Sequence, residues 1–401
     1  MRRNEYWAGF FTGLLLAAGA ALVLIVLTHI LEAHRGYVMS DPEHKAHLES
    51  LEDLVDLYYL NEVDDDALAD GVYKGLIEGL GDRYSRYYTA EEYTEEVEDS
   101  EGTYEGIGVL ISGLPDGNVR IEECYEGSPG SAAGLQKNDI ITMLDGVSVT
   151  EMSLSDVVER IQNTASGSVT VTILREGGDG AGEELEITVP VAHVELPSVF
   201  SEMMEDRTGY ILISEFKSVS YHQFCDAYDS LSAEGMEKLV IDLRGNPGGY
   251  LDVVCDILRR ILPKGLIVYT EDKNGVREEE YSDGESPIQI PLAVLVDGNS
   301  ASASEIFAGA VKDYKIGTIV GTTTYGKGIV QSIRVYKDGS AVKLTTSHYY
   351  TPEGHDIHEV GITPDVEVAM DEDVLLSEGD IQLQKAVEIL GSSTQLKEKT
   401  G

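Results

Sequence analysis

The chain has 401 residues, which is enough for two or three domains with a well-buried core. It carries 29 basic and 72 acidic side chains and a formal net charge of −43, which argues against nucleic acid and anionic lipid surfaces as ligands. The three cysteines, Cys124, Cys225 and Cys255, form no CxxC pair. A zinc finger, an iron–sulfur cluster and a disulfide-dense scaffold are therefore excluded, and at most one disulfide can form.

Residues 6–31 form an apolar run without a formal charge. A helix of about 20 apolar residues spans the hydrocarbon core of a bilayer. Arg2 and Arg3 precede the run, so the positive-inside rule places the N-terminus in the cytoplasm. A cleaved signal peptide is the alternative, but its apolar region is usually about 7–15 residues long and ends at a small-x-small site. We therefore predict a cytoplasmic stub over 1–6, a single-pass transmembrane signal anchor over 7–31, and an extracytoplasmic remainder at the cell membrane.

Residues 36–100 are acidic and patterned as helices. Apolar residues recur at helical spacing between residues 48 and 60 and again over 66–80, where glycines follow. A third helix is expected to begin near Thr89, because Thr-Ala-Glu-Glu is typical of an N-terminal cap. The region forms either a helical layer with solvated charges or a surface for association between protomers.

Two regions with different patterns of apolar residues follow. Residues 101–178 show the short apolar runs of β-strands, whereas residues 185–370 alternate strands with helices, which indicates a mixed or parallel sheet covered by helices. The expected strands lie at 107–111, 119–121, 140–144, 169–174, 185–191, 209–214, 238–243, 292–296, 318–321, 329–336 and 341–347, with a loop at 176–184. Helices are expected at 154–161, 251–262 and 302–312, and at 381–390 in a tail over 371–401. The predicted fold class is therefore α+β and multidomain.

Residues 292–305 contain a candidate nucleophile. An apolar strand ends at Asp297 and is followed by small residues from Ser300 to Ser304 before an amphipathic helix. Such a junction displays one side chain at the carboxyl edge of a sheet, beside the free N–H groups of the helix start. This arrangement suits a nucleophilic serine with an oxyanion site. The alternative is that Ser300 or Ser302 only caps the helix, which stabilises it by about 1 kcal/mol.

Two further segments bear on this hypothesis. Lys327 lies between two glycines in an otherwise uncharged stretch, and it can act as a base only if burial lowers its pKa by several units. It could instead be an exposed lysine in a turn. The glycine-rich segment 241–249 either presents N–H groups to an oxyanion or simply turns the chain into the next helix. The nearest histidines in the sequence are His348, His355 and His358.

Five motifs in this order resemble those of the carboxyl-terminal processing proteases, also called tail-specific proteases. They are GDRYSRY at 81–87, which is similar to the family's GDPYSRY, then DLRGNPGG at 242–249, SASASE at 300–305, GKGIVQ at 326–331 and GITPD at 361–365. The resemblance covers nearly all of the chain after the apolar run. It implies an α/β protease core with a mixed sheet over 185–370.

The resemblance further implies a Ser–Lys dyad with a supporting glutamine. Ser302, the middle serine of SASAS, would be the nucleophile, Lys327 the base and Gln331 the residue that orients the lysine amine. The backbone N–H groups of Gly248 and Ala303 would form the oxyanion hole. A Ser–His triad is the rival, and it is disfavoured because the lysine motif is intact and no histidine stands in a recognisable base motif.

The inserted region 101–178 resembles a PDZ domain. Tyr-Glu-Gly-Ile-Gly-Val at 104–109 is similar to its carboxylate-binding loop, whose N–H groups receive a peptide C-terminus before the peptide adds as a strand beside 109–111. A second motif over 128–141 has Asn138 where glycine is usual, and asparagine tolerates a positive φ better than most residues. The residues that the resemblance assigns to peptide binding are Gly106, Ile107, Gly108 and Val109.

These observations predict a membrane-anchored, extracytoplasmic serine endopeptidase that recognises substrate C-termini through its PDZ domain. The alternative is a noncatalytic, membrane-bound PDZ scaffold, which the intact serine, lysine and glutamine motifs disfavour. The expected partners are protein or peptide substrates and the membrane, and the resemblance suggests a homodimer formed by the N-terminal helices. No cofactor and no metal are expected, because His355 and His358 lack carboxylates at matching spacing.

Overall fold

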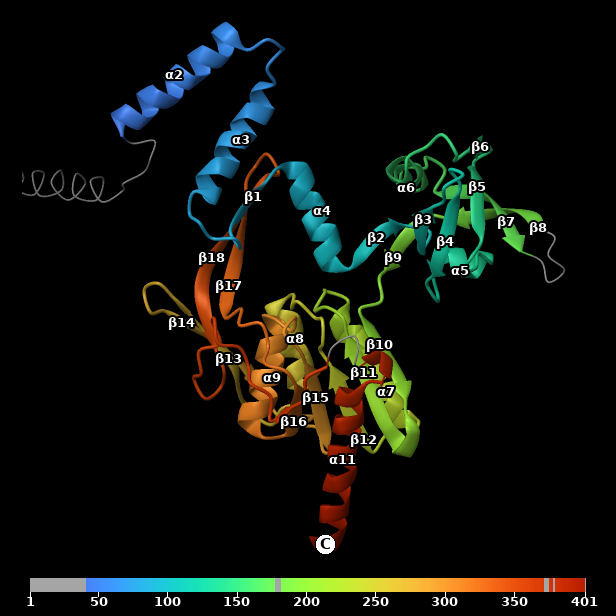
Figure 1. Ribbon diagram of the computed structural model, residues 1–401, viewed down its shortest axis with the longest axis vertical. Helices are drawn as coiled ribbons and strands as arrows, with labels where there is room; N and C mark the ends of the chain where they lie inside the picture. The colour runs from blue at the N-terminus through green and yellow to red at the C-terminus, as the bar shows by residue number, and fades with distance from the viewer. Residues whose placement is uncertain (1–40, 177–181, 371–374, 378, 401) are drawn as a thin grey trace, which may run out of the picture. The chain divides into compact units, whose positions relative to one another are not determined.

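The computed structural model describes residues 41–176, 182–370, 375–377 and 379–400 (Figure 1). The transmembrane anchor expected over 7–31 lies outside these residues, as does most of the loop expected at 176–184. Within the described ranges, no helix combines the length and the apolar character needed to cross a membrane. The chain divides into two units, one up to Tyr73 and one from Lys74 onward.

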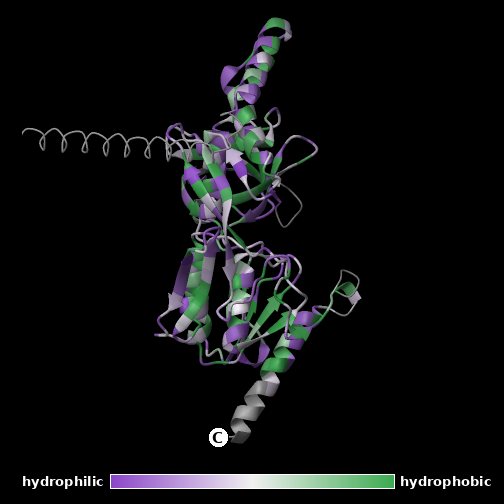
Figure 2. Cartoon of the chain, turned by 90° about the vertical axis from the view of Figure 1, so that its left-hand side faces the viewer, coloured by the Kyte–Doolittle hydropathy of each residue, from purple (hydrophilic) through white to green (hydrophobic). Residues whose placement is uncertain are grey.

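The first unit contains helix α2 (Pro42–Tyr58) and most of α3 (Asp65–Glu78), which correspond to the two helices expected there. Asp41 caps α2 by accepting a hydrogen bond from the N–H of Glu43 at 2.9 Å. Neither helix buries a residue, and Leu60, just after α2, is 93% exposed. In Figure 2 polar and apolar residues stand side by side along these helices. The helices are therefore held by local hydrogen bonds rather than by a core of their own.

Strand β1 (Arg86–Tyr88) and helix α4 (Ala90–Glu101) open the second unit. The cap predicted at Thr89 is present: the N–H of Glu92 donates to Thr89 Oγ1 at 3.2 Å, and the N–H of Thr89 donates to Glu92 Oε2 at 2.9 Å. Strand β1 was not expected from the sequence. It pairs antiparallel with β18 (Ala341–Tyr350), so the GDRYSRY segment lies against a sheet of the α/β core.

The region resembling a PDZ domain has a sheet in the order β3-β4-β5-β7-β8, with β6 paired to β5. Its elements are β3 (Val109–Gly113), β4 (Val119–Cys124), α5 (Pro129–Ala133), β5 (Ile140–Leu144), β6 (Val147–Ser148), α6 (Leu154–Gln162), β7 (Ser168–Glu176) and β8 (Gly182–Pro190). Ile121, Ile141 and Ile173 are fully buried in its core. Asn138 has φ 72°, as expected for the position where glycine is usual. A two-stranded ribbon of β2 (Thr103–Gly106) and β9 (Ala192–Glu195) connects this region to the core.

The central sheet of the α/β core has six strands in the order β10-β11-β12-β15-β16-β19. They are β10 (Val199–Met203), β11 (Thr208–Ile213), β12 (Lys238–Asp242), β15 (Leu292–Val296), β16 (Gly317–Gly321) and β19 (Val366–Glu367). All neighbours are parallel except β10 and β11. The mixed sheet predicted from the alternation of strands and helices is therefore present.

Helices cover both faces of this sheet (Figure 1). Successive side chains of a strand point to opposite faces. Leu239 and Ile241 accordingly pack with α7 (Ser220–Ala233), α8 (Leu251–Arg259) and α9 (Ala303–Tyr314). Val240 packs instead with Ala386 and Leu390 of α11 (Ile381–Thr400). Because β12 and β15 are parallel neighbours, their carboxyl ends meet at one edge, where the candidate site begins.

A second sheet has the order β1-β18-β13-β14, with β17 (Ile329–Val335) paired to β18. Strands β13 (Gly265–Asp272) and β14 (Arg277–Ser282) were not expected from the sequence. All residues of β14 except Ser282 are exposed, so this strand has no apolar alternation and is held by backbone pairing with β13. Helix α7 and strand β10 were missed as well, because each buries few side chains.

Candidate functional site

The turn after β15 is built around Asp297 and Ser300. Asp297 Oδ1 accepts hydrogen bonds at 3.0 Å from the N–H groups of Asn299, Ser300 and Gly245. Ser300 is fully buried, and its hydroxyl donates to the carbonyl oxygen of Leu243 at 2.8 Å. Ser300 therefore joins the turn to the glycine-rich loop after β12 and is engaged in holding the two together.

Ser302 stands at the junction between this turn and α9. Its φ of 53° and ψ of −113° are unusual for a residue with a side chain, and such strain is common in sharp strand-to-helix turns that expose a nucleophile. Gly248 approaches closely: a Cβ there would lie 2.7 Å from Ser302 Cβ and 3.1 Å from the Ala303 nitrogen. With φ at 111° as well, only glycine fits at position 248.

Glu305 connects the serine junction to the lysine segment. This carboxylate is completely buried and accepts four hydrogen bonds. The donors are the N–H of Ser302 (2.9 Å), the hydroxyl of Thr324 (2.6 Å), the N–H of Gly326 (2.7 Å) and the N–H of Lys327 (2.8 Å). Sequence reasoning gave Glu305 no role, although Ser-x-x-Glu at the start of a helix is a recognisable capping pattern. The carboxylate therefore fixes the backbone of both motifs.

Tyr349 provides a second connection between the same two motifs. Its hydroxyl lies 3.0 Å from the carbonyl oxygen of Ser302 and also contacts the carbonyl oxygen of Lys327. Burial raises the pKa of Tyr349 well above its ordinary value, so the hydroxyl keeps its proton and remains a donor. Nothing in the local sequence around Tyr349 indicates this contact.

The Lys327 amine lies 4.9 Å from the centre of the Tyr84 ring. Burial lowers the pKa of Lys327, and the positive charges of Lys343 and Arg83 lower it further, while Glu305 and Asp82 act in the opposite direction. This direction is the one that a lysine base requires. Among the described contacts, none joins the lysine amine to the Ser302 hydroxyl by a hydrogen bond.

The predicted catalytic and oxyanion-hole residues line one cavity of about 580 Å³. They are Gly248, Ser302, Ala303, Lys327 and Gln331. Gln331 Nε2 donates weakly to Thr345 Oγ1 at 3.4 Å. The N–H of Gly248 donates to Asn246 Oδ1 at 2.8 Å, so one of the two expected oxyanion donors is occupied within its own loop. The structure thus assembles the residues in one place, with this donor and the lysine amine directed elsewhere.

The glycine-rich loop is also held at its start by a charged network. The Arg244 guanidinium donates to Asp242 Oδ2 at 2.5 Å and to Asp380 Oδ2 at 2.7 Å, and the Tyr210 hydroxyl donates to Asp242 Oδ2 at 2.7 Å. Asp380 directly precedes α11 and accepts the N–H of Leu383 at 2.9 Å. The C-terminal helix therefore helps to fix the loop, a contact that the sequence did not predict.

The loop expected to bind a peptide C-terminus lies between β2 and β3, and β3 is an edge strand of its sheet. Gly108 has φ 78°, and a Cβ there would lie 2.1 Å from Ser128 Cβ. Burial raises the pKa of Tyr104 to about 12, although hydrogen bonds from the N–H groups of Gly108 and Val109 to its hydroxyl oxygen act in the opposite direction. The tyrosine hydroxyl therefore lies close to N–H groups that a peptide carboxylate would need.

The structure brings His355 close to two carboxylates that spacing in the sequence does not reveal. One potential ligand atom from each of Asp313, Glu353 and His355 lies within 4.8 Å of the others. Asp313 comes from the end of α9, 40 residues before Glu353, so sequence spacing could not reveal the cluster. Glu353 and His355 are exposed, and none of the three residues lines the cavity at Ser302.

The chain is similar to known peptidases and to known PDZ domains. The profile described as Peptidase family S41 matches residues 207–368, and a PDZ domain profile matches residues 120–175. The carboxyl-terminal-processing protease of Synechocystis is 34% identical over 335 residues, which cover 81% of this chain and 77% of the relative. The carboxy-terminal processing protease CtpB of Bacillus subtilis is 33% identical over 349 residues, which cover 85% and 71%.

A solved structure supports the fold alone. The crystal structure of an S41 protease from Bacteroides fragilis matches with a TM-score of 0.50 and 19% identity, over 84% of this chain and 93% of that chain. The extent of identity to the Synechocystis and Bacillus relatives decides the family. The chain therefore belongs to the carboxyl-terminal processing proteases of peptidase family S41 and is a serine-type peptidase with a PDZ domain.

Proposed function

We propose that this chain is a membrane-anchored, extracytoplasmic endopeptidase that binds substrate C-termini at its PDZ domain and cleaves peptide bonds with Ser302 and Lys327. The observation that carries the proposal is their meeting at one cavity. Ser302 stands on a strained strand-to-helix turn, Lys327 has a lowered pKa, and Glu305 fixes the backbone of both. Gln331 lines the same cavity.

The chemistry begins with neutral Lys327. Its amine takes the hydroxyl proton of Ser302 as Oγ attacks the substrate carbonyl carbon, and the ammonium then gives this proton to the leaving amine. A water molecule repeats the sequence to release the acyl group from the serine. The lowered pKa matters because a lysine of ordinary pKa, about 10.4, is almost fully protonated at neutral pH. Gln331 orients the amine between these steps.

Two adjustments separate the described arrangement from a reactive one. The Lys327 amine has to leave the ring of Tyr84 and reach the Ser302 hydroxyl. The N–H of Gly248 has to turn from Asn246 toward the cavity, which the positive φ values of Gly248 and Gly249 permit. It would then join the N–H of Ala303, the first of α9, as an oxyanion donor.

Substrate recognition and anchoring involve other parts of the chain. The free edge of β3 would accept the substrate's last residues as an added strand, with the carboxylate at Gly108. The anchor over 7–31 would keep the protease outside the cytoplasm. The exposed apolar side chains of α2 and α3 support a homodimer that would bury them.

The test is cleavage of an unstructured protein with an apolar C-terminus by the full chain in detergent micelles, with cut sites read by mass spectrometry. Ser302→Ala and Lys327→Ala should each lose activity by about 10⁴-fold or more. Lys385→Ala removes an exposed lysine whose only described partner is Glu388, and it should cleave like the parent. A C-terminal amide on the substrate should slow cleavage.

Two outcomes would contradict the proposal. Full activity in Lys327→Ala would remove the Ser–Lys mechanism. A parent chain that binds the C-terminal peptide but never cleaves would favour the noncatalytic scaffold. The anchor is tested separately by deleting residues 1–35 and following the protein between membrane and soluble fractions.

A further inference from the structure

A cluster of one arginine and two tyrosines lies beside Lys327 and has no role in the reaction described above. The Arg83 guanidinium donates to the Tyr84 hydroxyl at 2.5 Å and also to the Tyr325 hydroxyl, 242 residues away in the sequence. It also lies 4.7 Å from the centre of the Tyr84 ring and 5.5 Å from that of Tyr325. Arg83 therefore ties the segment before β1 to the segment that carries the lysine.

The Lys327 amine contacts the same tyrosine ring as Arg83. Its amine is 4.9 Å from the centre of Tyr84, so two cationic side chains contact one aromatic ring. The ring attracts each cation, while the cations repel each other. The position of Tyr84, which Arg83 fixes through the phenol oxygen, therefore bears directly on where the lysine amine rests and whether it keeps its proton.

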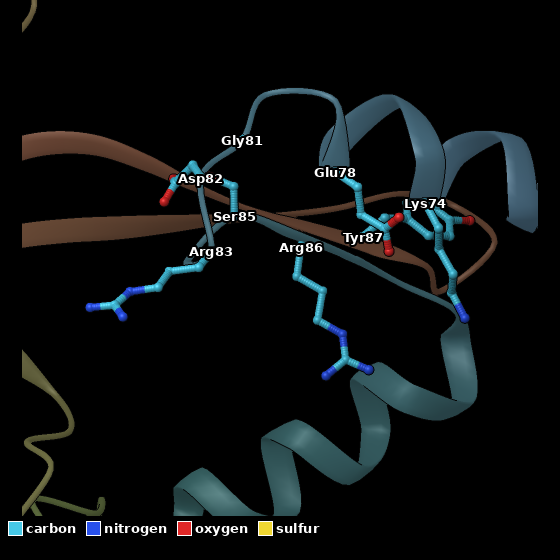
Figure 3. Close-up of a pocket in the computed structure, with 8 residues that line it drawn as sticks. All are labelled: Lys74, Glu78, Gly81, Asp82, Arg83, Ser85, Arg86 and Tyr87. Atoms are coloured by element: carbon cyan, nitrogen blue, oxygen red, sulfur yellow. Dashed lines mark hydrogen bonds between the residues drawn. The ribbon is translucent and has the colours of Figure 1, made fainter.

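The charge of Arg83 has no carboxylate partner among the described ion pairs, unlike that of Arg86 three residues later. Arg86 lies 3.5 Å from Glu92 and 4.8 Å from the Tyr88 ring. Figure 3 shows the two side chains extending in different directions, with Arg86 directed toward α4 and Arg83 away from it. Since an arginine stays protonated at any working pH, Arg83 keeps an uncompensated positive charge near the lysine.

The other charged groups that face Lys327 have partners of their own: an ion pair for Lys343, and hydrogen bonds from neutral groups for Asp82 and Glu305, which keep their negative charges. Lys343, on β18, pairs with Glu96 at 2.7 Å. Asp82 accepts the Ser85 hydroxyl at 2.6 Å, and Glu305, on α9, accepts four hydrogen bonds as described above. Burial and the charges of Lys343 and Arg83 together lower the pKa of Lys327, against Glu305 and Asp82. Placing a lysine next to another cation is an established way to activate it.

We propose that Arg83 is a positioning residue for Lys327: it holds Tyr84 and Tyr325 around the lysine and supplies an unpaired positive charge that favours the neutral amine. This inference rests on the proposed role of Lys327 as the base. Arg83 stands where the similar family segment GDPYSRY has proline, which carries no charge and no donor.

The test is the pH dependence of kcat for the full chain in detergent micelles, measured with an amidated peptide so that C-terminal recognition does not contribute. Arg83→Gln should move the midpoint of the rise in kcat to higher pH. A shift of one pH unit corresponds to an about tenfold lower kcat below the midpoint, with recovery at high pH. Arg83→Lys keeps the charge and should keep the midpoint. Arg86→Gln removes an equal charge that does not face the lysine, and its profile should match the parent.

A second measurement avoids turnover altogether. NMR titration of labelled lysine side chains in a Ser302→Ala chain, with Lys327→Arg used to assign the signal, should show a higher pKa for Lys327 when Arg83 is replaced by glutamine. Coincident profiles and titrations for Arg83→Gln, Arg86→Gln and the parent would overturn the inference. So would an equal loss of kcat at every pH, which is what a purely structural role predicts. An active Lys327→Ala chain would instead overturn the proposed function, and the inference with it.

Discussion

Two loops of this molecule present backbone N–H groups through glycines, and in each a side-chain oxygen atom lies close to those groups. In the PDZ domain, the hydroxyl of Tyr104 lies near the N–H groups of Gly108 and Val109. In the protease core, Asn246 Oδ1 accepts the N–H of Gly248 at 2.8 Å. Of the two sites that are proposed to bind negative oxygen atoms, the one in the protease core is thus closed by a hydrogen bond, whereas the one in the PDZ domain only has a hydroxyl beside it.

The Asn246 and Tyr104 side chains differ in how firmly they are held. Asn246 is fully buried, its Nδ2 donates to the carbonyl oxygen of Ile213 at 2.8 Å, and its own carbonyl oxygen accepts the N–H of Ala301 at 3.0 Å. Tyr104 is only half-buried. A rotation of the tyrosine side chain can therefore open the recognition loop, whereas the catalytic loop can open only if its backbone turns at Gly248 and Gly249. The peptide-binding loop is therefore easier to open than the catalytic loop.

The largest effect is expected on stability, from removing the buried Glu305 carboxylate that binds the backbone of Ser302 and Lys327. Glu305→Ala leaves four buried donors without an acceptor, so the free energy of unfolding should fall by about 3–5 kcal/mol. Denaturant unfolding followed by circular dichroism measures this change. Glu305→Gln keeps one acceptor oxygen and should lose less. Glu202→Ala, an exposed acid on β10, should change stability little, and equal losses in Glu202→Ala and Glu305→Ala would refute the role of Glu305.

Replacing one glycine in each loop, in two separate variants, tests whether the loops act independently. Gly248→Ala forces a Cβ to 2.7 Å from Ser302 Cβ, and we expect an about 100-fold or greater loss of kcat with unchanged binding of a peptide C-terminus. Gly108→Ala forces a Cβ to 2.1 Å from Ser128 Cβ and should abolish that binding while cleavage of a short amidated peptide continues. Steady-state rates and fluorescence anisotropy give the two readouts. Loss of both activities in both variants would show that the loops are not independent.

The ion pair between Arg244 and Asp380, which joins the catalytic loop to the start of α11, should make the free energy of unfolding pH-dependent. Burial raises the pKa of Asp380, but hydrogen bonds from Arg244 and from the N–H groups of Leu383 and Gln382 outweigh it and hold the pKa below its ordinary value. A lowered folded-state pKa stabilises the protein above the unfolded-state pKa, about 3.9, and this stabilisation is lost as the pH falls through the folded-state pKa.

Asp380→Asn should therefore lower the free energy of unfolding by about 1–2 kcal/mol at neutral pH, and the gap to the parent should close in acid. Urea unfolding at a series of pH values measures the gap. Asp229→Asn is a suitable control, because its ion pair with Arg260 is exposed and should contribute less than about 0.5 kcal/mol. A gap that stays constant down to acid pH would contradict the assignment.

The smallest effect is expected at the peptide-binding loop of the PDZ domain. Tyr104→Phe removes the hydroxyl that lies beside the N–H groups of Gly108 and Val109 and would compete with a carboxylate for them, so a peptide C-terminus should bind about two- to fivefold more tightly. Tyr125→Phe leaves that hydroxyl in place and should not change the dissociation constant. Weaker binding in Tyr104→Phe would mean that the hydroxyl assists the peptide rather than competing with it.

Features encoded by neighbouring residues were predictable. The cap at Thr89 and the positive φ of Asn138 follow from local hydrogen bonding and backbone sterics. The strand-to-helix junction at Ser302 follows from an apolar run, small residues and an amphipathic helix. Strand β14 could not be predicted in this way, because it is exposed and charged and exists only through pairing with β13.

The sequence by itself determined the family, the order of the motifs and the identity of five residues that line the cavity, because these depend on residue type and short spacing. Only the tertiary structure decided how the motifs are held. Glu305 joins Ser302 to Lys327, Arg83 reaches Tyr325 across 242 residues, and Arg244 reaches Asp380 across 136. Such contacts carry no periodicity along the chain, since they form only when packed strands and helices bring distant polar groups into a buried space where each must find a partner.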